Sequence, residues 1–89
     1  MNRRSETVVN MELLALLLEG PRGPSRICQA LNLNFNKFLE MATYQESKGF
    51  IRREADGARE VYFVTDKGRD LYNKWTEFYR AFGENTYLK

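Results

Sequence analysis

The apolar positions near the start of the chain recur with the period of a helix. In residues 5–19 they cover most of the helix circumference, and three glutamates mark the remaining polar side. Ser5 has a side chain suited to capping the helix start, and Gly20-Pro21 ends the pattern. We therefore expect a helix over residues 5–19 that is buried on most sides.

A short second helix is expected after a tight connector at residues 21–24, which contains two prolines and a glycine. Ser25 is a suitable N-cap, and the helical pattern continues to about Leu31. Ile27, Ala30 and Leu31 form the expected inner face of this helix.

The third helical pattern covers residues 35–48, with Asn34 as its N-cap and Gly49 as its left-handed end. Only residues 32–34 separate it from the second helix, and such a short turn suits a helix-turn-helix pair. The residues expected to pack on the first two helices are Phe35, Phe38, Ala42 and Gln45.

After Gly49 the pattern changes from a helical period to that of strands. Residues 50–54 form one expected strand, and residues 60–64, rich in β-branched and aromatic side chains, form the returning one. Asp56-Gly57 between them is a hairpin-turn signal.

The last helix is expected to start after a cap at Thr65, to run to about Phe82 and to stop at Gly83. Its aromatic stripe is too large for a terminal helix of so small a chain to bury alone, and the spacing matches a coiled-coil seam. We interpret residues 66–83 as a homodimerisation helix, the alternative being a helix folded back on its own domain. The predicted interface residues are Leu71, Tyr72, Trp75, Phe78, Tyr79 and Phe82.

The element order is therefore three helices, a hairpin and a fourth helix. A hairpin directly behind a tight helix pair is typical of a winged helix, a mainly α fold with a β-hairpin (α+β). The 89 residues contain no repeat and no long linker, so we expect a single domain over residues 1–89.

Composition argues against an enzyme, a metal site and a cofactor. The sequence has no histidine, which removes the usual general base and the commonest metal ligand. Its single cysteine, Cys28, excludes an internal disulfide and is expected to be a small buried hydrophobe. No nucleophile with its base and no glycine-rich phosphate loop are present.

No apolar run has the length of a membrane span, and the basic start, Met1 to Arg4, is not followed by a signal-like segment. We therefore expect a cytoplasmic protein with no membrane partner.

Several short motifs, taken together and in order, resemble the small archaeal and archaeal-virus winged-helix DNA-binding regulators. The resemblance covers about residues 10–75, most of the chain. It implies a dimeric DNA-binding protein, and some members dimerise through the last helix as an antiparallel coiled coil. The sequence departs from the pattern at Ala42 and Gln45, where the family usually has leucines. The matching motifs are Ser25-Arg26-Ile27, Ala30, Asn32-Leu33-Asn34-Phe35, Lys48-Gly49-Phe50-Ile51 and Tyr62-Phe63-Val64-Thr65-Asp66-Lys67-Gly68.

In a winged helix the third helix is the recognition helix, and its face opposite the packing residues is rich in hydrogen-bonding side chains. Asparagine can bond adenine, lysine can reach guanine or phosphate, and a glutamate can accept from cytosine. The alternative is a merely solvated helix face. The candidate DNA contacts are Asn34, Asn36, Lys37, Glu40, Thr43, Tyr44 and Ser47.

Cations on the hairpin and around the second helix are candidates for contacts to the phosphate backbone or minor groove. The net charge of +2 permits nucleic-acid binding without indicating it. Arg3 and Arg4 form either an arm or a frayed terminus. The candidate backbone and wing contacts are Arg22, Ser25, Arg26, Arg52, Arg53 and Arg59.

The sequence thus predicts a sequence-specific double-stranded DNA-binding homodimer that regulates transcription. Two alternatives stay open: a winged helix used for protein contacts, and a nonspecific architectural DNA-binding protein, which usually needs a more basic surface.

Overall fold

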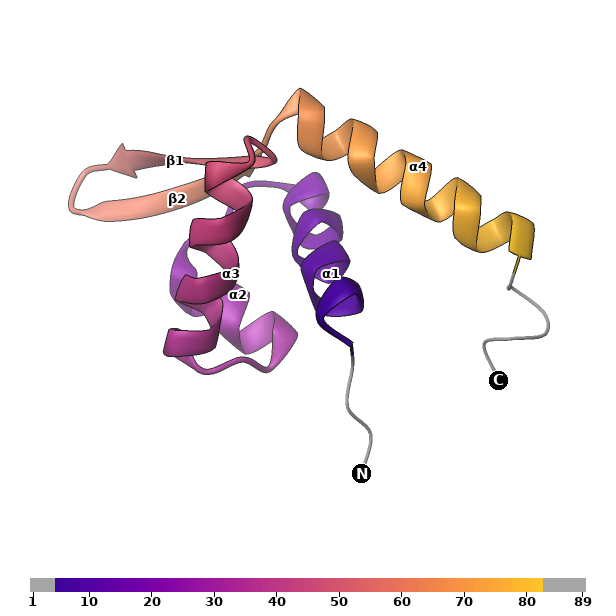
Figure 1. Ribbon diagram of the computed structural model, residues 1–89. Coiled ribbons are helices and arrows are strands. Elements are labelled where there is room, and N and C mark those ends of the chain that lie inside the picture. The colour runs from indigo at the N-terminus through magenta and orange to yellow at the C-terminus, as the bar shows by residue number, and fades with distance from the viewer. Residues whose placement is uncertain (1–4, 83–89) are drawn as a thin grey trace.

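The computed structural model describes residues 5–82, and this part of the chain contains four helices and one hairpin in the predicted order (Figure 1). Gly83, expected to stop the last helix, and Arg3 and Arg4 lie outside the described residues. The elements are α1 (Glu6–Glu19), α2 (Pro24–Leu31), α3 (Phe35–Ser47), β1 (Ile51–Asp56), β2 (Arg59–Val64) and α4 (Asp66–Phe82).

Side-chain caps fix the starts of three helices, as the sequence predicted. The Ser5 hydroxyl accepts a hydrogen bond from the backbone N–H of Val8 at 3.1 Å. Asn34 Oδ1 accepts from the N–H of Lys37 at 2.8 Å. The Thr65 hydroxyl accepts from the N–H of Gly68 at 3.0 Å. Each bond satisfies a donor that a helix start leaves unpaired.

Helix α2 differs from its prediction at its start. Gly23 is the N-cap and Pro24 the first helical residue, so Ser25 lies inside the first turn and does not cap the helix. A proline fits that place because the first N–H groups of a helix have no partner within it. Ala30 is exposed, and Ile27 and Leu31 alone are buried from this helix.

The core lies between the first three helices and the base of the hairpin. Leu13, Leu14, Ile27 and Phe38 are fully buried. The ring of Phe38 meets that of Tyr62 edge-on at 5.4 Å between centroids, an arrangement aromatic rings favour. Helix α3 is thereby fixed against the rest of the domain.

The packing face of α3 was predicted only in part. Phe35, expected to be buried, is 55% exposed, because it is the first residue of the helix and lies beyond the core. The residues that α3 buries are Phe38, Met41, Ala42 and Gln45.

The two strands form an antiparallel hairpin whose register runs from Ile51 opposite Val64 to Asp56 opposite Arg59. The loop is therefore Gly57-Ala58, one residue later than predicted. Gly57 adopts φ +67°, a conformation that glycine adopts without strain. Arg22 adds a short bridge to the hairpin, since its backbone pairs with that of Tyr62 in both directions.

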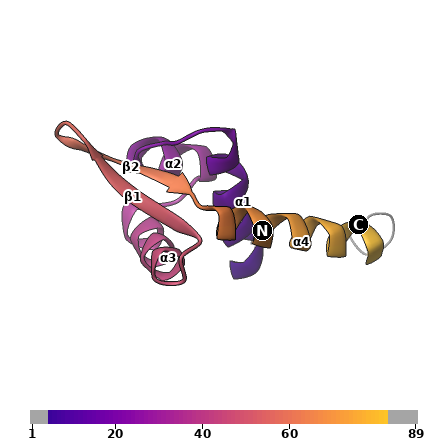
Figure 2. The same ribbon diagram turned by 90° about the horizontal axis from the view of Figure 1, so that it is seen from above.

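The hairpin, or wing, and α4 project on opposite sides of the three-helix body (Figures 1 and 2). Helix α4 begins in close contact with the domain: a Cβ added at Gly68 would lie 2.2 Å from the carbonyl oxygen of Phe50. Its far end leaves the body, and Phe78 and Phe82 are each 61% exposed. Within residues 5–82, no helix is long and apolar enough to span a membrane.

Candidate nucleic-acid interface

The outer side of α3 presents a row of short polar side chains. At about 100° per residue, this row lies opposite the buried side chains of the helix. The exposed residues in it are Asn36, Glu40, Thr43 and Ser47. Asn36 and Thr43 have no side-chain hydrogen bond to another residue of the described chain, so their polar groups face solvent unpaired.

Other candidates on α3 already have intramolecular contacts. Asn34 caps the helix, and the Ser47 hydroxyl donates to the carbonyl oxygen of Tyr44 at 2.7 Å. Tyr44 is 55% exposed, with the Lys48 ammonium 5.6 Å from its ring centroid. The hydroxyl oxygens of Ser47 and Tyr44 can still accept hydrogen bonds, so both side chains remain able to contact a ligand.

Lys37 points toward α1 rather than straight outward. Its Nζ lies 2.6 Å from Glu6 Oε2 and 3.7 Å from Glu40 Oε1. The hydrogen bond to Glu6 raises the pKa of Lys37, and the charge of Glu40 acts in the same direction. The lysine therefore stays protonated, with two carboxylates balancing its charge.

Strand alternation separates the two arginines of β1, as expected. Arg53 faces α3, with Nε 3.2 Å from Glu46 and a terminal nitrogen 3.3 Å from Glu60. The hydrogen bond to Glu46 raises its pKa. Arg52, on the other face, lies 4.4 Å from the centroid of the Phe63 ring and pairs with Glu54.

The remaining cations of the candidate set divide into engaged and unpaired residues. Arg22 donates to the carbonyl oxygens of Leu16 at 2.8 Å and Gly20 at 2.7 Å, so its guanidinium holds the end of α1. Arg26 on α2 and Arg59 at the wing tip line one surface groove and have no ion pair within residues 5–82. Ser25 is exposed close to Arg26 in the chain.

The aromatic stripe of α4 is continuous but only half covered. Leu71, Tyr72 and Trp75 pack against the core cluster. The rings of Trp75 and Tyr79 stack at 4.5 Å, and those of Phe78 and Phe82 lie 4.8 Å apart beyond the body.

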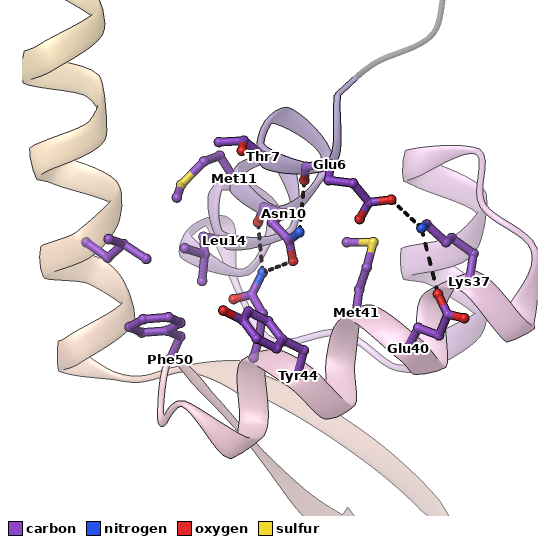
Figure 3. Close-up of a pocket in the computed structure, with 12 residues that line it drawn as sticks. Glu6, Thr7, Asn10, Met11, Leu14, Lys37, Glu40, Met41, Tyr44 and Phe50 are labelled. Carbon is purple, nitrogen blue, oxygen red and sulfur yellow. Dashed lines mark hydrogen bonds and ion pairs between the residues drawn. The ribbon is translucent and has the colours of Figure 1, made fainter.

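A pocket of about 490 Å³ lies between α1, α3 and the start of α4 (Figure 3). Among the residues that line it, Gln45 is the buried polar one, at 2% exposed. Gln45 Nε2 donates to the backbone oxygen of Asn10 at 3.0 Å and to its Oδ1 at 2.9 Å. Gln45 Oε1 has no partner within the described chain. A buried acceptor in this state costs about 1–3 kcal/mol.

The apolar pattern of the sequence predicted Gln45 on the packing face of α3, and nothing in that pattern indicated this pocket. The available signal was a long polar side chain at a position whose helical neighbours are apolar. Three candidate DNA contacts, Lys37, Glu40 and Tyr44, also line the pocket. The sequence did not indicate that these residues border a cavity.

The described residues contain no group of three or more side chains suited to hold a metal ion. Cys28 is partly buried, and burial raises the pKa of its thiol.

Comparison with known proteins identifies the architecture. A family model described as winged helix-turn-helix matches residues 3–82. An uncharacterized protein of the archaeon Methanocaldococcus jannaschii is 30% identical over 77 residues, 86% of this chain and 75% of that protein. These matches confirm the resemblance to archaeal winged-helix proteins.

Solved structures agree. The chain is similar to a homodimeric winged helix-turn-helix DNA-binding domain of Mycobacterium bovis, a possible ArsR-family transcriptional regulator (TM-score 0.79, 18% identity, 92% of this chain and 77% of that one). It is also similar to the transcriptional regulator BldR of Sulfolobus solfataricus (TM-score 0.77, 20% identity, 88% of this chain and 63% of that one). A transcriptional regulator of Clostridium thermocellum has a TM-score of 0.77 and 19% identity, and the match covers 89% of this chain and 90% of that one. At these identities the likeness establishes the fold.

Proposed function

The chain belongs to the winged helix-turn-helix family, and we propose that it is a sequence-specific double-stranded DNA-binding protein that regulates transcription as a homodimer. The observation that carries the proposal is the exposed polar row on the outer side of α3, in which Asn36 and Thr43 are unpaired within the described chain, on a helix held by a buried core. A major groove admits one α-helix, and its base edges are read by side chains of this kind.

Within this proposal, Asn36 and Thr43 are the first candidates for base contacts. Both are exposed and unpaired within the described chain, and asparagine can bond adenine through two hydrogen bonds. Glu40, beside them, can accept from the amino group of cytosine. It also disfavours sites where it would face only acceptors.

Backbone contacts are assigned to Arg59 on the wing and Arg26 on α2. These cations have no ion pair within residues 5–82, so binding a phosphate would not require them to leave a carboxylate. Arg52 and Arg53 would first have to release their glutamate partners. Arg22 is better explained by its bonds to the end of α1.

The homodimer part of the proposal rests on the far half of α4. Phe78 and Phe82 are exposed on the same stripe that seats the helix on its own domain, and large exposed apolar patches mark interaction sites. A two-fold dimer would present two copies of α3 to half-sites about 34 Å apart. The M. bovis neighbour is described as homodimeric.

The charge of the chain favours specific over architectural binding. A net charge of +2 gives little sequence-independent attraction to DNA. The family is non-enzymatic in general, and the proposal includes no catalytic step.

Selection of binding sites from random DNA tests the proposal directly, followed by titration of the selected site at two salt concentrations. We expect a two-fold symmetric site that is bound more tightly than random DNA at physiological salt.

Three variants test the roles of the residues. Asn36→Ala and Thr43→Ala should change the sequence preference, at a cost of about 1–3 kcal/mol per lost base contact. Arg59→Ala should weaken all sites about equally and reduce the salt slope by about one. Lys74→Ala, a surface cation on α4 paired with Asp70, is the control and should leave binding unchanged. Equal losses on every sequence from the first three variants would contradict the assigned roles.

One observation keeps the protein-interaction alternative open: Phe35 and Leu39, at the edge of α3, are 55% and 39% exposed. A protein that selects no DNA sequence but still dimerises would favour that alternative.

A further inference from the structure

We propose that the pocket between α1, α3 and α4 binds a small organic cation: an amine or amidine with N–H donors attached to an apolar, ring-sized body. Its volume, about 490 Å³, is within the range of about 300–1,000 Å³ typical of small-molecule sites. This binding does not depend on the proposed DNA-binding function.

The two ends of the pocket differ in chemistry (Figure 3). Met11, Leu14 and Phe50 lie at the end toward α4, where Leu71 also lines the wall. The Glu6–Lys37–Glu40 ion pairs lie at the other end. A ligand that fills the pocket therefore needs an apolar part and a polar part.

The buried acceptor specifies hydrogen-bond donors on the ligand. Asn10 Nδ2 donates to the carbonyl oxygen of Glu6 at 2.8 Å, which fixes the orientation of the Asn10 amide. Its Oδ1 therefore accepts from Gln45 Nε2, and Gln45 Oε1 is left as the unpaired atom. Gln45 is 2% exposed and lines the pocket, so a ligand donor that reaches its amide oxygen would satisfy the unpaired atom.

The charge of the lining residues favours a cationic donor over a neutral one. The charged lining residues are Glu6, Glu40 and Lys37, so two negative charges and one positive leave a net charge of −1. The two carboxylates are 73% and 76% exposed, so solvent screens their ion pairs with Lys37, and they can turn toward a ligand at little cost. An anion would meet both carboxylates and an acceptor oxygen, so it is disfavoured.

Binding would also act on α3. Lys37, Glu40 and Tyr44 line the pocket and are candidate DNA contacts, so a ligand in the pocket competes with DNA for the same side chains. This consequence, unlike the binding itself, rests on the proposed function.

The test compares two probes of nearly the same shape, phenethylamine, a cation at neutral pH, and phenylacetate, an anion. Full-length protein labelled with ¹³C in the methionine methyl groups reports binding through Met11 and Met41, which both line the pocket. We expect phenethylamine to shift both resonances to saturation, with phenylacetate at least about tenfold weaker.

Two variants locate the site. Gln45→Met keeps the side-chain length and removes the acceptor, and should weaken phenethylamine by about tenfold. Gln45→Met also removes the hydrogen bonds to Asn10 and could disturb folding. A second variant therefore changes only side chains on the exposed rim of the pocket. Glu6→Gln combined with Glu40→Gln should bring the two probes toward equal affinity, whereas Glu77→Gln, exposed on α4, should change nothing.

Absence of saturable shifts at both methyl groups, or equal affinity of the two probes for the native protein, would overturn the proposal. Methionine resonances that shift with protein concentration but respond to neither probe would also overturn the proposal, because a partner protomer would then fill the pocket. Probe binding without any effect on DNA affinity would leave the site standing and remove only the competition with DNA.

Discussion

Helices α1 and α4 are both rich in large apolar side chains, yet the domain encloses one and only partly covers the other. Helix α1 buries five residues, and it packs against α2, β2 and α4. Helix α4 buries only Gly68, and its partners are α1 and β2. Trp75 is half-covered, and Phe78 and Phe82 extend beyond the body.

The difference follows from how the apolar positions are distributed around each helix. In α1 they cover most of the circumference, so the helix is stable only when neighbours surround it. In α4 they form one stripe, which a single neighbouring surface can cover. The domain supplies that surface for the first half of α4 alone. Apolar content therefore does not by itself distinguish a core helix from a helix with an exposed apolar stripe.

The largest expected loss of stability comes from a substitution in α1, the enclosed helix. Leu14→Ala should lower the free energy of unfolding by about 2–5 kcal/mol, because it removes a fully buried side chain and leaves a cavity. Urea denaturation measures the loss. Phe78→Ala, at a protein concentration where the chain is monomeric, is the matched control. An equally large loss in the control would show that α4 is part of the core.

Gly68→Ala tests how α4 is seated. An added Cβ would lie 2.2 Å from the Phe50 carbonyl oxygen and 2.9 Å from a Val64 methyl group. We expect a destabilisation of about 1–3 kcal/mol, opposite to the usual gain from replacing a helical glycine by alanine. Asn73→Ala, exposed on the same helix, should be neutral or slightly stabilising. An unchanged melting temperature for Gly68→Ala would mean that α4 is not held by this contact.

Replacing both exposed phenylalanines, Phe78→Ser with Phe82→Ser, should abolish the proposed dimer while changing the stability of the monomer by about 0.5 kcal/mol or less. Sedimentation equilibrium measures the first quantity and urea denaturation of dilute protein the second. Glu77→Ser, exposed on the same helix but outside the stripe, is the control. If the double variant still dimerises, the dimer interface lies on another surface of the domain.

The smallest effect is expected at alkaline pH and comes from one buried residue and one exposed ion pair. Burial raises the pKa of Tyr62 above its ordinary value of 10.0, so the unfolded chain loses this proton first and stability falls as pH rises past that value. The raised pKa of Lys37 acts in the same direction, because its stabilising pair with Glu6 is lost once the lysine deprotonates. Melting curves from about pH 8 to about pH 11 should show the decline, with a shallower slope for Tyr62→Phe.

Much of the fold could be predicted because its signals are local. The caps at Ser5, Asn34 and Thr65 bond to residues three positions along the chain, so the sequence contains both partners side by side. The start of α2 was missed because Gly23 and Ser25 are both acceptable N-caps, and a proline between them decided the choice.

Of the candidate interface, the sequence indicated which face of α3 is polar, and the structure shows which side chains on it are already engaged. Lys37 pairs with Glu6, 31 residues earlier, and Gln45 bonds Asn10, 35 residues earlier. No local pattern predicts such pairs, because they depend on how α1 and α3 pack.

The sequence by itself determined the order of the elements, most helix ends, and the distribution of apolar side chains around α1 and α4. Those properties depend on hydrogen bonds and periodicities within a few residues. Tertiary structure alone decided that the domain covers only half of the α4 stripe, that Arg22 holds the end of α1, and that a pocket with an unpaired acceptor lies beside α3. Such features arise where segments distant in the chain meet, and their geometry depends on all of those segments at once.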